Sequence, residues 1–91
     1  MLVRKIEKGF YEVIDDQNNN YRIEDQRRAE KPNGLIDQSK LACPNPRTIL
    51  HGRWCIYEQS EGEWVYLDDN KTLKECLTVI ETWAAASELG T

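Results

Sequence analysis

The sequence predicts an α+β fold: an antiparallel sheet of four or five strands in two β-hairpins, with one C-terminal α-helix packed across a face. Two observations lead to this fold class. Two pairs of short, β-rich segments are each separated by turn-forming residues, and residues 72–90 repeat apolar side chains at helical spacing. With 91 residues, 40% of them hydrophobic, the chain is expected to form a single domain over residues 1–91. No apolar run is long enough for a membrane helix.

The first hairpin is expected to pair residues 10–14 with residues 21–24 through the polar turn 15–20. Residues 2–6 add an earlier strand, which ends at Lys8 and Gly9. Alternation assigns an apolar face to the hairpin, made of Tyr11, Val13, Tyr21 and Ile23. It assigns a solvent-exposed face to Glu12, Arg22 and Glu24.

Residues 25–52 form a long polar loop between the two hairpins. This segment holds all three prolines of the chain, and residues 35–42 are expected to make one or two helical turns. So long a connection is uncommon in a compact domain and is usually functional or mobile.

The second hairpin is expected to pair residues 54–58 with residues 63–67 around a turn at 60–62. One face is assigned to Cys55, Tyr57, Val65 and Leu67, and the other to Trp54, Ile56, Trp64 and Tyr66. Both faces are apolar, whereas a sheet with one solvated side alternates apolar and polar residues. The loop 25–52 folding back, a protein partner or a second copy in a homodimer must therefore cover one of them.

The helix is expected to run from about residue 73 to 88. Thr72 and Glu75 have capping-box spacing at its start, and Gly90 is a natural stop. One apolar stripe is formed by Leu73, Cys76, Leu77, Ile80, Trp83 and Ala84. The stripe is expected to pack on the sheet.

The sequence offers no set of catalytic residues. Three cysteines without an apolar leader are typical of reduced thiols in the cytoplasm. The spacing of Cys43, His51, Cys55 and Cys76 does not fit a zinc knuckle or ribbon, and no oxyanion donors accompany a Cys–His pair. We therefore expect no enzyme activity, no metal and no cofactor.

Charge is divided unevenly along the chain. Residues 1–53 carry ten Lys and Arg against eight Asp and Glu, whereas residues 54–91 carry two against eight. The C-terminal part is suited to a larger protein or nucleoprotein partner with a basic surface. The residues expected to bind that partner are the aromatic and acidic side chains Trp54, Glu58, Glu61, Glu63, Trp64, Tyr66, Asp68 and Asp69.

These observations favour a non-enzymatic protein-interaction module that inhibits or adapts its partner. In size, charge and lack of catalytic residues the chain resembles the inhibitors and anti-defence proteins of phages and mobile elements, and toxin-immunity proteins. The alternative is a nucleic-acid-binding module that uses the basic residues of 22–53 and an aromatic sheet face. In outline, residues 53–83 resemble the small sheet-and-helix DNA-binding domains of phage-type integrases, without their basic character.

Overall fold

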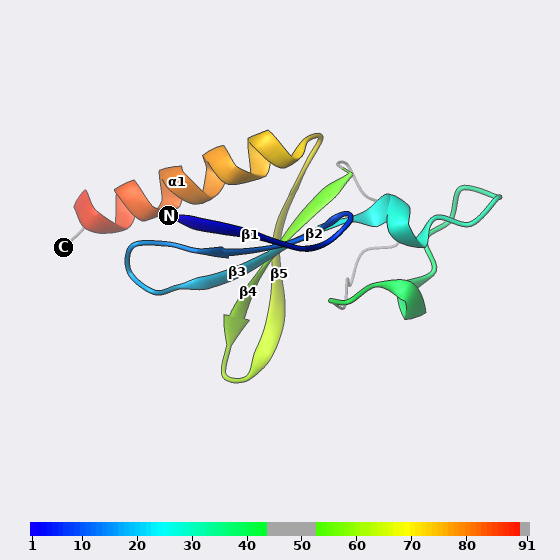
Figure 1. Cartoon of the computed structure of the whole chain (residues 1–91), viewed down its shortest axis with the longest axis horizontal. Helices are drawn as coiled ribbons and strands as arrows, with labels where there is room; N and C mark the ends of the chain where they lie inside the picture. The colour runs from blue at the N-terminus through cyan, green and yellow to red at the C-terminus, as the bar shows by residue number, and fades with distance from the viewer. Residues whose placement is uncertain (44–52, 90–91) are drawn as a thin grey trace.

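A computed structural model describes residues 1–43 and 53–89 of the chain (Figure 1). The strands are β1 (Leu2–Glu7), β2 (Phe10–Ile14), β3 (Asn20–Asp25), β4 (Trp54–Ser60) and β5 (Glu63–Asn70). They form one antiparallel sheet in the order β1-β2-β3-β4-β5, and the helix α1 (Leu73–Leu89) follows. The predicted α+β fold is thus confirmed. Among the described helices, none has the length and apolar character needed to cross a membrane.

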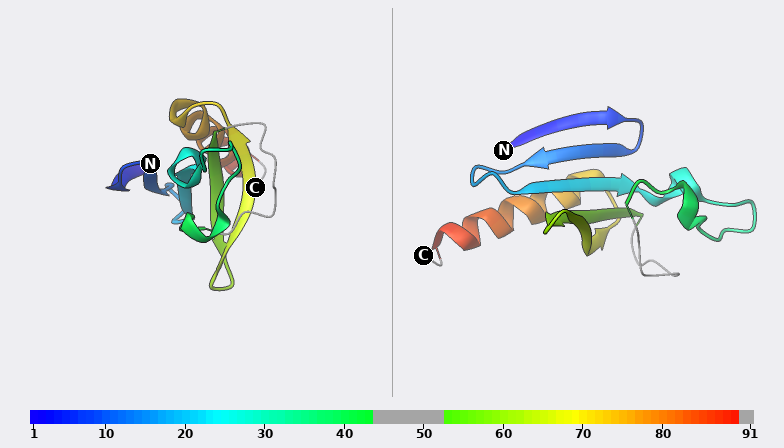
Figure 2. Two further views of the ribbon diagram at one scale, coloured as in Figure 1. Left: turned by 90° about the vertical axis from the view of Figure 1, so that its right-hand side faces the viewer. Right: turned by 90° about the horizontal axis from the view of Figure 1, so that it is seen from below.

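Helix α1 begins where its sequence predicts. The Glu75 N–H donates to Thr72 Oγ1 at 3.1 Å, and Glu75 Oε2 accepts from the backbone N–H of Lys71 at 3.4 Å. This arrangement satisfies N–H groups that the first helical turn leaves free. Figure 2 shows the helix lying across one face of the sheet, where it packs against β4 and β5.

The main core lies between α1 and the sheet. It is made of the buried side chains Val13, Tyr21, Ile23, Ile56, Cys76 and Ile80. The predicted apolar face of the first hairpin is therefore confirmed, because Tyr11 also packs against this core. Cys76 is a fully buried thiol, as its place on the helix stripe predicts.

A second, smaller core lies on the opposite face of the sheet. It contains Phe10, Cys43, Cys55 and Tyr57. The prediction that Glu24 faces solvent is wrong, because its side chain is completely buried. Its carboxylate accepts the backbone N–H groups of Ala42 and Cys43 at 2.8 and 3.2 Å, which fixes that segment against the sheet.

The segment after β3 therefore covers part of the second face. It contains two short 3₁₀ helices, η1 (Gln26–Ala29) and η2 (Gln38–Lys40), so the helical turn expected within residues 35–42 is present. Gln26, Ala29 and Cys43 are buried, in agreement with a loop that folds back, whereas Leu35 is 59% exposed in the part of the loop that projects away from the strands (Figure 1). Residues 44–52, which include Pro44, Pro46, Arg47 and His51, lie outside the described part of the chain.

The turn between β2 and β3 is organised by Asp15. Its carboxylate accepts the backbone N–H groups of Gln17 and Asn19, both at 2.9 Å, and the Asn19 side-chain amide at 3.0 Å. Burial by itself raises the pKa of Asp15, but these hydrogen bonds outweigh it and hold the pKa below its ordinary value.

Asp15→Asn should therefore lower the free energy of unfolding by about 1 kcal/mol near neutral pH, because a charge-assisted hydrogen bond is lost. A carboxylate with a lowered folded-state pKa stabilises the fold above the pKa of the unfolded chain, and the contribution disappears as pH falls through the folded value. Urea denaturation should show wild type and variant converging below about pH 4. A difference that is constant with pH would contradict this role.

Candidate functional site

The β4–β5 hairpin carries the strongest concentration of one charge. Residues 54–70 contain five acidic residues and no Lys or Arg. Ser60 pairs with Glu63, and the two residues between them have positive φ angles, 52° at Glu61 and 82° at Gly62. These angles belong to a two-residue turn whose twist matches that of the strands. The tip of the hairpin extends beyond the other strands (Figure 1).

Three glutamates surround this tip. Glu61 and Glu63 are exposed and Glu58 is half-buried. No described Lys or Arg forms an ion pair with any of the three. Their charge is therefore not neutralised by a nearby cation in the described chain.

The two aspartates predicted to join this surface are placed differently. Asp69 accepts the hydroxyl of Tyr66 at 2.6 Å, and Asp68 accepts the backbone N–H of Asp69 at 2.9 Å. Both aspartates are half-buried at the base of the hairpin. The structure thus brings the glutamates together at the tip and assigns the aspartates to internal hydrogen bonds.

The predicted assignment of aromatic residues to the two faces of the hairpin is wrong for Trp64 and Tyr66. Both pack with Cys55 and Tyr57 on the face away from α1, whereas Trp54 packs against the helix-side core. The reason is the length of the turn. A two-residue turn pairs Tyr57 with Tyr66, whereas the expected three-residue turn shifts the register by one, which reverses the faces.

Each predicted aromatic anchor is half-buried against another side chain. The guanidinium carbon of Arg22 lies 4.9 Å from the centre of the Trp64 ring. The centre of the Trp54 ring lies 6.1 Å from that of Tyr11. The rings of Tyr66 and Tyr57 meet edge-on, with their centres 6.0 Å apart. These packed rings contribute to the two cores of the domain.

Two exposed apolar residues of β5 were missed as candidate anchors. Val65 is 45% exposed and Leu67 is 37% exposed. Val65 pairs with Glu58, and Leu67 lies at a bulge where the β4–β5 register shifts between Ile56 and Tyr57. The signal in the sequence was the pair Glu61-Gly62, which favours a two-residue turn. With that turn, Val65 lies on the face of the sheet opposite to Tyr57.

Comparison with protein-family models, with curated proteins and with solved structures gives no match for this chain. The assignment of a site therefore depends on its geometry.

The described cysteines are separated by the sheet. Cys76 belongs to the helix-side core, and Cys43 and Cys55 to the opposite one. Burial raises the pKa of both Cys43 and Cys76 to about 12, so each thiol stays protonated near neutral pH. In the described ranges no cluster of three or more His, Cys, Asp or Glu side chains is placed to hold a metal ion. The Cys–His pairing considered for His51 lies outside these ranges.

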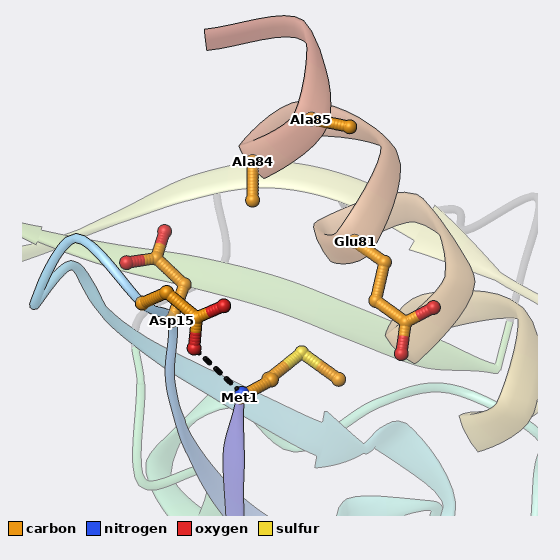
Figure 3. A pocket seen from close by; sticks show the side chains of 6 residues that line it. Met1, Asp15, Glu81, Ala84 and Ala85 are labelled. Atoms are coloured by element: carbon orange, nitrogen blue, oxygen red, sulfur yellow. Dashed lines mark hydrogen bonds and ion pairs between the residues drawn. The ribbon is translucent and has the colours of Figure 1, made fainter. Parts of the chain in front are cut away.

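A second acidic surface lies beside the N-terminus. Met1, Asp15, Asp16, Glu81, Ala84 and Ala85 line a cavity of about 190 Å³ between the β2–β3 turn and α1 (Figure 3). The Met1 ammonium group donates to Asp16 Oδ1 at 2.8 Å, and this bond raises the pKa of the ammonium group. Because a cation of the chain already lies there, we place the candidate site on the hairpin tip.

Proposed function

We propose that the protein is a small non-enzymatic binding module that inhibits or adapts a larger protein or nucleoprotein partner. Its acidic β4–β5 hairpin docks on a basic surface of that partner, in the manner of phage or mobile-element anti-defence and immunity proteins. The observation that carries the proposal is the contrast between the glutamates of the hairpin tip and the carboxylates elsewhere in the sheet.

Carboxylates of the first three strands are paired within the chain. Glu12 contacts Arg4 and Arg22 at 2.8 and 2.9 Å. The other paired carboxylates in this part of the sheet are Glu7 and Glu24 with Arg28, and Asp25 with Arg53. Such pairs largely cancel at a distance, so the field of the unpaired hairpin glutamates dominates the approach of a basic partner.

Contact energy would come from the exposed aliphatic residues beside those glutamates. Val65 and Leu67 lie on the edge strand β5 and offer apolar area that a partner can bury. They take the anchoring role expected for Trp54 and Trp64, whose rings are half-buried within the domain. Steering would come from Glu58, Glu61 and Glu63. Asp68 and Asp69, which were also expected to steer the partner, are held in hydrogen bonds at the base of the hairpin.

The alternative, a nucleic-acid-binding module, has less support. Arg22, Arg28 and Arg53 belong to the basic segment invoked for it, and each is held by a carboxylate. Arg22 also lies against the Trp64 ring on the face where bases would have to stack. An extended nucleic-acid track needs clustered, available Lys and Arg.

The test is a charge reversal at the hairpin tip. A tagged pull-down from the native host, with and without nuclease, first identifies the partner. We expect Glu61→Lys with Glu63→Lys to slow association with that partner by about tenfold or more at low salt, and to flatten its salt dependence. Stopped-flow or surface-plasmon kinetics over a range of ionic strength measures both effects.

The matched control reverses two other exposed acids, Glu30→Lys with Glu81→Lys, and so changes the net charge equally. We expect the control to retain most of the wild-type rate, because these residues lie away from the tip. Equal association rates for the hairpin variant and the wild type would mean that the hairpin tip is not part of the interface. A partner band that disappears with nuclease would support the alternative.

A further inference from the structure

A basic cavity lies away from the acidic hairpin tip. Its volume is about 330 Å³, at the small end of the range for ligand sites. Three segments distant in the sequence form it: the β1–β2 turn, the residues around the start of η1, and the residue before β4. Its lining is Lys8, Gly9, Asp25, Arg27, Arg28 and Arg53. Four cationic side chains thus converge there with one carboxylate.

Two of the arginines are fixed in orientation. Arg53 donates to Asp25 through Nε at 2.7 Å and through Nη2 at 2.5 Å. Arg28 donates to Glu24 at 3.0 Å and also to Glu7. A guanidinium group carries more N–H donors than these bonds use. Both arginines can therefore offer preoriented donors to an anion at the cavity.

The other two cations are available. Lys8 and Arg27 are exposed, and neither forms an ion pair with any carboxylate of the described residues. Asp25 and the two glutamates that hold Arg28 balance three of the four positive charges, so one positive charge is left. The exposed side chains of Lys8 and Arg27 supply the uncompensated charge.

Gly9 allows this arrangement to form. Its φ angle is +79°, and a Cβ atom there would lie 2.8 Å from Arg28 Cδ and 3.1 Å from Asp25 Cβ. Its carbonyl also accepts the Asp25 N–H at 2.8 Å. The turn backbone can therefore lie directly against the two side chains that form the cavity wall.

We propose that this cavity binds a phosphate group, with Lys8 and Arg27 neutralising its charge while Arg28 and Arg53 orient its oxygens. A phosphate group matches several converging donors better than a carboxylate, because it has more charge and more acceptor oxygens. The group belongs to a free phosphate compound or is a single phosphate of a nucleic-acid strand, since both present the same chemistry and one bound phosphate does not require an extended basic track. The proposal uses none of the hairpin residues assigned to the protein partner.

The test is a ¹H–¹⁵N NMR titration of the full chain at constant ionic strength. Sodium pyrophosphate is the probe in one arm and a short oligothymidylate in the other, with sodium acetate as the carboxylate control. We expect saturable shifts centred on the Gly9 and Arg27 amides with at least one phosphate probe and none with acetate. Lys8→Ala with Arg27→Ala should weaken that binding about tenfold or more, since both charges are lost.

The matched control is Lys71→Ala with Lys74→Ala, which removes two exposed cations at the start of α1 and should bind as wild type. Saturation by pyrophosphate identifies a free phosphate compound, and saturation by the oligonucleotide alone identifies a strand. Absence of saturation with both probes overturns the proposal. Equal binding of acetate, or wild-type affinity in the Lys8 and Arg27 double variant, overturns it as well. Every readout is independent of the protein partner.

Discussion

Replacing Ile80 with alanine is expected to lower the free energy of unfolding by about 2–5 kcal/mol, because buried methyl groups are lost and a cavity is left. The side chain is fully buried in the helix-side core. It packs there with Val13 and Ile23, which come from two different strands, and with Ile56 from a third. Urea denaturation followed by circular dichroism measures the loss.

Lys74→Ala is the control for this prediction, because the exposed Lys74 side chain lies on the same helix. We expect that change to alter the free energy of unfolding by no more than about 0.5 kcal/mol. A loss well under about 1 kcal/mol for Ile80→Ala would mean that α1 does not depend on this contact with the sheet.

Glu24→Ala is expected to have an effect of similar size, about 3 kcal/mol, because one partner of a buried ion pair is removed. The buried carboxylate accepts hydrogen bonds from Ala42 and Cys43 and from the guanidinium group of Arg28. Truncation leaves these donors without their acceptor, and the hydrogen bond of the Cys43 N–H lies where water is excluded. Urea denaturation measures the loss, and hydrogen exchange should show reduced protection of the Ala42 and Cys43 amides.

Glu24→Gln and Glu30→Ala separate the causes. The glutamine keeps one acceptor oxygen in the same place, so its cost should lie between those of wild type and alanine. Glu30 is exposed next to η1, and its removal should leave the Ala42 and Cys43 amides protected. Unchanged protection in Glu24→Ala would mean that other contacts hold residues 42 and 43 on the sheet.

The elements of the fold could be predicted because their signals are local. Turn residues separate the strands, and the Thr72 cap and the apolar stripe define α1, which ends within one residue of the predicted limit. The main core followed from the same alternation, because each strand of the first hairpin has one clearly apolar face.

The faces of the second hairpin could not be predicted in the same way. Both of its faces are apolar, so the sequence pattern does not distinguish one register from the next. The register depends on whether the turn has two or three residues, and that choice decided where Trp64 and Val65 point. As a result, the position of the glutamates around the turn followed from the sequence, whereas the faces on which Trp64 and Val65 lie did not.

Burial of Glu24 was hidden for another reason. Strand β3 alternates apolar and polar residues, as a strand with one solvated face does. The groups that cover Glu24 are residues 42 and 43, which are distant from it in the sequence. Only the tertiary structure shows that an acidic side chain supplies acceptors for a loop whose backbone N–H groups need them.

The order of the strands has a consequence for folding kinetics. Each strand pairs with its neighbour in the sequence, and most of these pairings are closed by short turns. The exception is the central pairing of β3 with β4, which requires residues 26–53 to form a closed loop. Loop closure costs entropy before contacts compensate for it. We therefore expect the two halves of the sheet to form as local units, with the largest entropic cost at the step that joins β3 to β4.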